Sequence, residues 1–144
     1  MANIRLEPYI FFKGNAKEAM EFYKDVFGGE LIMQTLGESP KDVLEQMKID
    51  ESRYGEIMHA RLKGGSFNLM ASDSQKASPE AKKITLSING SSADEAEMRE
   101  MFDKLSEGGK VSQTLEKMFW GDIFGSLTDK YGVEWMMNIG DSMG

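Results

Sequence analysis

The sequence predicts an α+β fold made of two successive βαβββ modules, and three observations support this. The order strand, helix, strand, hairpin occurs twice along the chain. Each long predicted helix ends at a glycine pair, and the two pairs are separated by 108 − 28 = 80 residues. At that offset seven positions are identical: Ile4/Ile84, Leu6/Leu86, Ala16/Ala96, Phe22/Phe102, Lys24/Lys104, Gly28/Gly108 and Gly29/Gly109. Chance similarity between two amphipathic helices is the alternative explanation for the identities, so the order of elements carries more weight.

The first module begins with a strand from Arg5 to Phe12, which is rich in aromatic and branched residues. Apolar residues at spacings of three and four then predict an amphipathic helix from Ala16 to Phe27. A strand from Leu31 to Leu36 and a short helix from Pro40 to Lys48 follow. Residues 55–73 read as two strands joined by a tight glycine turn, which completes the module.

The second module repeats this order with a strand from Ile84 to Ile88, a helix within residues 91–109 and a strand from Lys110 to Lys117. Met118 to Asn138 then predict a final pair of strands around a turn at residues 129–132. We expect one domain over residues 1–144, with modules at about 1–75 and 80–144. Because each helix covers one face of its sheet, the uncovered faces are expected to form a mostly antiparallel, rolled sheet that encloses a cavity.

The composition excludes several classes of partner. The net charge is −7 and no basic run occurs, so binding to nucleic acid or to an anionic membrane surface is not expected. The chain has no cysteine, which rules out disulfides and zinc-thiolate sites. The first residues lack the uninterrupted apolar segment of a signal peptide, and we expect a cytoplasmic protein.

Three segments carry a resemblance to a known family: PYIFFKGNAKEAMEFYKDVFGG, GEIMHARLKGGSFNLMASD and MFWGDIFGSLTDKYGVEWMMN. Together they resemble the PhnB-like branch of the vicinal-oxygen-chelate superfamily, which has the fold of glyoxalases, bleomycin-resistance proteins and extradiol dioxygenases. The resemblance covers most of the chain. It implies paired βαβββ modules and a homodimer, and it implies that relatives with enzymatic activity bind a divalent metal through ligands on four strands.

The positions that match those metal ligands hold poor donors in this sequence. The first matches Pro8, and the second lies in the strand segment from Phe67 to Ala71, which reads Phe, Asn, Leu, Met, Ala. The third lies in the strand Ile84 to Ile88, which offers a threonine and a serine, and the last matches Met136. A thioether is a poor ligand for a hard cation, so we expect no metal and no other cofactor.

Two residues are candidates for catalysis. His59 is the one histidine of the chain, and strand alternation puts Ile57, His59 and Arg61 on the cavity face. His59 is a candidate general base and Arg61 a candidate clamp for an anion, although a structural, hydrogen-bonded histidine is the alternative. Glu134 shares strand parity with Met136 and is a second candidate base, with a solvent-exposed carboxylate beside a turn as the alternative.

The remaining candidates are predicted to line the ligand site. Alternation sends Trp120, Asp122 and Phe124 to one face, where ligand contact and simple core packing are both open interpretations. Met70 and Met136 offer adaptable apolar surface. Two functions follow: binding of a small apolar or aromatic molecule without a metal, or metal-independent isomerase or lyase chemistry with His59 as general base.

Overall fold

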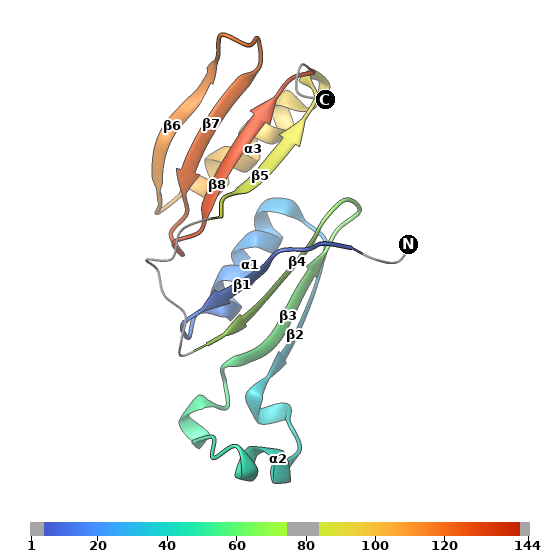
Figure 1. Ribbon diagram of the computed structural model, residues 1–144, viewed down its shortest axis with the longest axis vertical. Coiled ribbons are helices and arrows are strands. Elements are labelled where there is room, and N and C mark those ends of the chain that lie inside the picture. The colour runs from blue at the N-terminus through green and yellow to red at the C-terminus, as the bar shows by residue number, and fades with distance from the viewer. Residues whose placement is uncertain (1–4, 75–83, 142–144) are drawn as a thin grey trace. The chain divides into compact units, whose positions relative to one another are not determined.

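The computed structural model describes residues 5–74 and 84–141, and it divides the chain into two compact units, Met1–Ser78 and Pro79–Gly144. Each unit contains one open, four-stranded sheet with a long helix on one face (Figure 1). The α+β class and the two βαβββ modules predicted from the sequence are confirmed.

The first unit has the strand order β1-β4-β3-β2. β1 is parallel to β4, and the other neighbouring strands are antiparallel. Its elements in chain order are β1 (Tyr9–Phe12), α1 (Ala16–Phe27), β2 (Glu30–Thr35), η1 (Leu36–Glu38), α2 (Lys41–Gln46), η2 (Glu51–Arg53), β3 (Ile57–Lys63) and β4 (Asn68–Asp73).

The second unit repeats this topology with the strand order β5-β8-β7-β6, in which β5 and β8 are the parallel pair. Its elements in chain order are β5 (Leu86–Gly90), η3 (Ser92–Asp94), α3 (Glu95–Ser106), β6 (Lys110–Lys117), β7 (Ile123–Thr128) and β8 (Glu134–Ile139). The same arrangement in both units supports the duplication proposed from the sequence.

The helix residues that enter the two cores correspond at an offset different from that of the glycines. Ala19, Tyr23 and Val26 of α1 are buried, and their counterparts in α3 are Met98, Phe102 and Leu105, which gives an offset of 98 − 19 = 79. The sequence alignment at 80 therefore pairs residues on different faces of the helices. The shift arises because α1 ends directly before Gly28, whereas Glu107 separates α3 from Gly108.

The glycine pairs themselves are equivalent. Gly28 and Gly108 have φ values of 74° and 73°, in the left-handed region that favours glycine after a helix. A Cβ on Gly29 would lie 2.6 Å from the backbone oxygen of Lys63, and a Cβ on Gly109 would collide with the backbone oxygen of Thr128. Each second glycine thus allows the first strand after the helix to pack closely against the end of the neighbouring strand.

One carboxylate joins three parts of the first unit. Asp73, the last residue of β4, accepts hydrogen bonds through Oδ1 from the backbone N–H groups of Gly14 and Ala16, both at 2.9 Å. Its Oδ2 accepts a third, at 2.8 Å, from the N–H of Ile57 at the start of β3. Asn15 makes no side-chain cap, so Asp73 satisfies the helix terminus from a distant strand.

The predicted alternation is wrong at the start of β3. Ile57 is 2 % exposed and belongs to the core, whereas Met58 is 41 % exposed. The pairing with β2 explains this, because Gln34 lies opposite His59 but Thr35 lies opposite Ile57, which leaves Met58 as an extra residue in a bulge. From His59 onward the alternation is regular, with Ala60 and Leu62 buried under α1.

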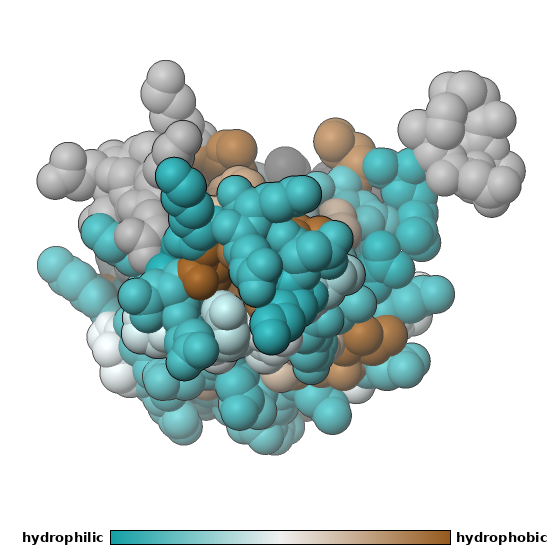
Figure 2. Space-filling view, turned by 90° about the horizontal axis from the view of Figure 1, so that it is seen from below, coloured by the Kyte–Doolittle hydropathy of each residue, from teal (hydrophilic) through white to brown (hydrophobic). Residues whose placement is uncertain are grey.

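The connection between the second and third strands differs between the units. In the first unit it runs from residue 36 to residue 56 and contains η1, α2 and η2, with Leu44 buried and Met47 exposed. In the second unit it is a turn over residues 118–122. Figure 2 shows the end of the molecule that carries α2, whose surface is largely hydrophilic with small hydrophobic patches.

The three hydrogen bonds of Asp73 predict a large loss of stability on truncation. Replacing Asp73 with Ala is expected to lower the free energy of unfolding by about 2–3 kcal/mol, because three N–H groups lose their acceptor and two of those hydrogen bonds are part-buried. Urea denaturation measures the change. The control is Asp25→Ala, at an exposed aspartate of α1, which is expected to stay within about 0.5 kcal/mol of wild type. Equal stability of the two variants would contradict this role of Asp73.

Candidate functional site

The face of each sheet that its helix does not cover carries the predicted site residues. His59 and Arg61 on β3 and Met70 on β4 lie on the open face of the first sheet. Trp120, Asp122, Phe124, Glu134 and Met136 belong to the second unit. The candidates therefore form two groups, one on each sheet.

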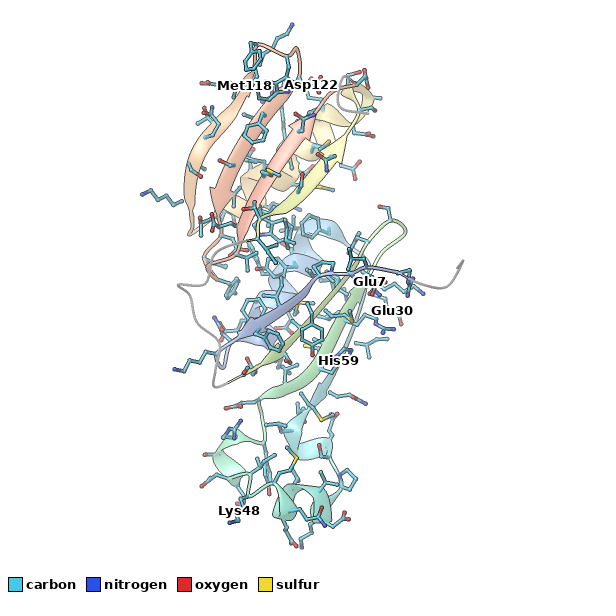
Figure 3. The ribbon with its side chains drawn as sticks, viewed as in Figure 1. Glu7, Glu30, Lys48, His59, Met118 and Asp122 are labelled. Carbon is cyan, nitrogen blue, oxygen red and sulfur yellow. The ribbon has the colours of Figure 1, made fainter. Side chains whose placement is uncertain are left out.

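His59 lies beside an aromatic residue that the sequence analysis did not select. The hydroxyl of Tyr9 on β1 lies 3.4 Å from Nδ1 of His59, and the two ring centroids are 5.9 Å apart. Tyr9 also contacts Phe11, with ring centroids 5.1 Å apart. Figure 3 shows His59 on β3, with Glu7 and Glu30 toward the other end of the same sheet. His59 thus has a hydrogen-bonding partner on the open face. Such a partner fits both interpretations of His59, as a general base and as a structural residue.

Arg61 occupies the middle of the open face. Its cross-strand neighbours are Ile32 on β2 and Met70 on β4, and Tyr9 lies opposite Met70 on the far side of β4. Tyr9 and Ile32 are exposed, and Met70 is half-buried. The guanidinium is therefore attached to an otherwise apolar row that crosses all four strands.

A polar row closes one end of this face. Register places Glu30 opposite Lys63 and Lys63 opposite Asn68. The Nδ2 of Asn68 donates to Oε2 of Glu7 at 2.7 Å, and Oε1 of Glu7 lies 2.8 Å from Nε of Arg5. Asn68 is 8 % exposed, and its hydrogen bond to Glu7 is part-buried.

In the second unit, one asparagine fixes the tryptophan. Asn138 on β8 donates from Nδ2 to Oδ2 of Asp122 at 2.9 Å and accepts at Oδ1 a 3.4 Å contact from Nε1 of Trp120. Asp122 is 4 % exposed and Trp120 is 37 % exposed. The buried carboxylate thereby orients the amide, and the amide in turn orients the indole.

The indole lies against a second aromatic ring. The ring centroids of Trp120 and Phe124 are 6.0 Å apart in an edge-to-face arrangement, and Phe124 is the cross-strand neighbour of Asn138. The predicted alternation had assumed that Trp120 and Asp122 lie in a strand. They lie instead in the turn before β7. The structure nevertheless brings the three predicted residues together.

The rest of the second open face is more polar than the sequence analysis expected. Met136 lies opposite Ser126 on β7 and Ser87 on β5, and Glu134 lies opposite Thr128. The Oγ atoms of Ser112 and Ser126 are 3.1 Å apart. Apolar contact on this face is concentrated at Trp120, Phe124 and Met136, with hydroxyl groups between them.

One aspartate and one tryptophan have structural positions. Asp129 accepts hydrogen bonds from the N–H groups of Tyr131 and Val133 and from Nε1 of Trp135, at 2.8 to 3.0 Å. Asp129 therefore stabilises its own turn. Trp135 is 6 % exposed and belongs to the core.

A hollow of about 400 Å³ lies at one end of the second sheet. Asp122, which also accepts a hydrogen bond from Asn138, is the one predicted site residue in its lining. The lining residues are Ser92, Glu95, Lys117, Gly121, Asp122, Ile123, Ile139, Gly140 and Asp141.

The structure also shows where two of the positions matched to metal ligands lie. Pro8 directly precedes β1, and Met136 lies on the open face of β8. Among residues 5–74 and 84–141, no three His, Cys, Asp or Glu side chains are grouped so that they could hold a metal ion. In the same part of the chain, no helix is long and apolar enough to cross a membrane.

Residues 5–137 match the family model of the Glyoxalase/Bleomycin resistance protein/Dioxygenase superfamily. The chain belongs to this superfamily. The recognition made from the three sequence segments is therefore confirmed. A curated relative, protein YjdN of Escherichia coli (strain K12), is 30 % identical over an alignment that covers 93 % of this chain and 94 % of the relative.

Solved structures of superfamily proteins share the fold. Protein PA1353 from Pseudomonas aeruginosa is 39 % identical, with a TM-score of 0.81 over 96 % of this chain and 98 % of the other. A putative 3-demethylubiquinone-9 3-methyltransferase, PhnB protein, from Bacillus cereus is 24 % identical, with a TM-score of 0.71 over 95 % and 100 % of the two chains. The fosfomycin resistance protein FosX from Listeria monocytogenes, complexed with Mn(II), is 10 % identical, with a TM-score of 0.60 over 98 % and 95 %.

Sequence reasoning missed two residues of the candidate site. Tyr9 directly follows Pro8, which had been considered only as a failed metal ligand, and its strand parity with Phe11 could have placed it on the open face. Asn138 shares parity with Glu134 and Met136, so its position was foreseeable. Its role was not, because Trp120 and Asp122 reach it from a turn whose geometry the alternation does not describe.

The chain of contacts through Asn138 predicts a spectroscopic change. Asn138→Leu is expected to make Trp120 more accessible to acrylamide quenching, because the indole loses its acceptor. Trp135 is buried and contributes a nearly constant, protected signal. The control is Asn89→Leu, at the residue opposite Asn138 on β5, which is outside this chain of contacts. If quenching is the same in the Asn138 variant and wild type, Asn138 does not position the indole.

Proposed function

We propose that the protein binds a small apolar or aromatic molecule on the open faces of its sheets, without a metal. The observation that carries this proposal is the Trp120–Asn138–Asp122 arrangement, which holds an indole edge-to-face with Phe124 on a face that no helix of the unit covers. Burial of a carboxylate costs desolvation free energy, and simple packing of a partly exposed aromatic ring does not require it. A ring oriented by such a carboxylate is suited to stacking against a ligand.

Both sheets supply side chains suited to such a ligand. Met70 and Met136 offer flexible apolar contact, and Arg61 offers a charged hydrogen-bond donor. Absence of a metal is supported by the donor chemistry of the matched positions, where proline and a thioether replace oxygen or nitrogen ligands. We further propose that the two modules form one domain.

We also propose that the protein is a homodimer, as the family resemblance implies, and that it is cytoplasmic, as expected from the interrupted apolar character of its first residues. Exposed aromatic side chains on the open faces, among them Phe11 at 59 % exposure, are suited to being covered by further protein surface. The proposed partners are a small-molecule ligand and a second copy of the chain. Neither nucleic acid nor a membrane is among them.

An enzymatic function is the second candidate. The contact between the Tyr9 hydroxyl and Nδ1 of His59 would fix the ring orientation and leave Nε2 available for proton transfer. The proposed reaction class is isomerase or lyase chemistry with His59 as general base, and Glu134 as a second base. No glycine-rich strand-to-helix motif supports nucleotide-cofactor binding of the kind a methyltransferase needs.

The stacking surface predicts how binding of a neutral aromatic probe, naphthalenemethanol, depends on Trp120. Trp120→Ala is expected to lower the affinity for the probe about tenfold, because the aromatic contact is lost. Val111→Ala is the control, since Val111 is an exposed apolar residue of β6 in the same unit, at 38 % exposure, and is not among the ring contacts of Trp120. Calorimetric titration measures the affinities.

The same titration tests metal independence. After dialysis against a chelator, the affinity of wild-type protein for the probe is expected to be unchanged, and elemental analysis of the purified protein is expected to find only traces of metal. Stoichiometric Mn, Fe, Ni or Zn, together with loss of binding after chelation, would contradict the proposal.

His59→Ala separates the two candidate functions. A thermal-shift screen of metabolites identifies compounds that stabilise the wild-type protein, and each is then incubated with wild type and variant. For a binding protein, we expect the compounds to be recovered unchanged from both. A compound that wild type converts and His59→Ala does not would favour the enzymatic candidate.

A further inference from the structure

We infer that the ligand of the first sheet is an amphipathic organic anion, an apolar or aromatic molecule whose carboxylate or phosphoryl group pairs with Arg61. This inference rests on the proposed binding function and adds the chemical class of the ligand. It depends on the charges and neighbours of the residues on the open face of β3.

The open face of β3 is a basic stripe in an acidic protein. His59, Arg61 and Lys63 alternate with buried residues along the strand, so their side chains point to the same side, with successive members about 7 Å apart. The whole chain has a net charge of −7. Local positive charge on this face is therefore set by a few placed side chains and not by the general composition.

Arg61 differs from the other arginines of the chain. Arg5, Arg53 and Arg99 each form an ion pair with a glutamate, at 2.8 to 3.1 Å. Arg61 forms none with any residue in the described ranges 5–74 and 84–141. Its fork of N–H donors is therefore available to an anion from outside these residues.

The glutamates on the same face have other neighbours. Glu7 is bound by Arg5 and by Asn68, and Glu30 lies opposite Lys63 in the polar row. Arg61 lies in the next row, between Ile32 and Met70. A ligand anion would consequently meet the guanidinium without displacing an existing ion pair.

The surroundings of Arg61 define the rest of the ligand. Met70 and Ile32 flank the arginine, and the rings of Tyr9 and Phe11 lie on the adjacent edge strand, 38 % and 59 % exposed. An inorganic anion would leave this apolar and aromatic surface uncovered, and a neutral hydrocarbon would leave the guanidinium without a partner. A molecule with both parts satisfies both, because the charge-assisted hydrogen bonds and the apolar contacts are made together.

Three matched probes test this inference: naphthoate, naphthyl phosphate and the neutral naphthalenemethanol. With the wild-type protein, at least one anion is expected to bind about tenfold more tightly than the neutral probe, as measured by calorimetric titration. The relative affinity of naphthoate and naphthyl phosphate distinguishes a carboxylate from a phosphoryl ligand.

Arg61→Gln is expected to abolish the preference for the anion while leaving the affinity for the neutral probe unchanged. Arg99→Gln, at an ion-paired arginine on α3, is the control and is expected to keep the preference. Equal affinity of wild type for all three probes, or a preference that survives in Arg61→Gln, would overturn the inference and leave the proposed function intact. Failure of all three probes to bind would overturn the proposed function and this inference with it.

Discussion

The packing of one helix against one face of each four-stranded sheet determines how the strand side chains divide. In the first unit α1 buries Met20 and Tyr23 completely, together with Ala60 and Leu62 of β3. Because neighbouring residues of a strand point to opposite faces, this burial directs His59 and Arg61 to the other side. The open faces therefore follow from the position of the helices, and the chemistry they carry is a consequence of which residues occupy the alternate positions.

The two units apply this constraint with different polar anchors. In the first, the carboxylate of Asp73 at the end of β4 binds the start of α1 and the start of β3. In the second, Asp141 after β8 binds the N–H and hydroxyl groups of Ser92, in the short η3 helix before α3. A carboxylate at the end of the last strand thus secures the chain ahead of the long helix in both. The anchor differs in detail because the segment it binds is longer in the second unit.

Much of the fold could be predicted because it depends on local periodicity. The helix from Ala16 to Phe27, the glycine stops and the order of elements along each module follow from spacing and from the repeated sequence of elements. The bulge at Met58 could not be predicted, since it arises from pairing with β2 and leaves no mark in the sequence. The buried helix residues correspond at an offset of 79 and the glycine pairs at an offset of 80, and this difference could not be predicted either. The identical residues at an offset of 80 suggest a correct alignment, although they lie on different faces of the two helices.

The candidate site was less predictable than the fold. The alternation of side chains along a strand correctly predicted that His59, Arg61 and Met136 lie on the open faces, because a strand has only two sides. The arrangement of Trp120, Asp122 and Asn138 depends on a turn that brings residues from two segments together, and hydrogen bonds of this kind cannot be read from alternation. Tyr9 was missed because its contact with His59 joins strands that are far apart in the sequence.

The unequal connections, residues 36–56 in the first unit and 118–122 in the second, show where this fold tolerates a change of length. Both leave the ends of strands, so insertions and deletions there cost little free energy. A longer or shorter connection would therefore alter the surface at the end of the sheet and leave the packing of the helix-covered face intact.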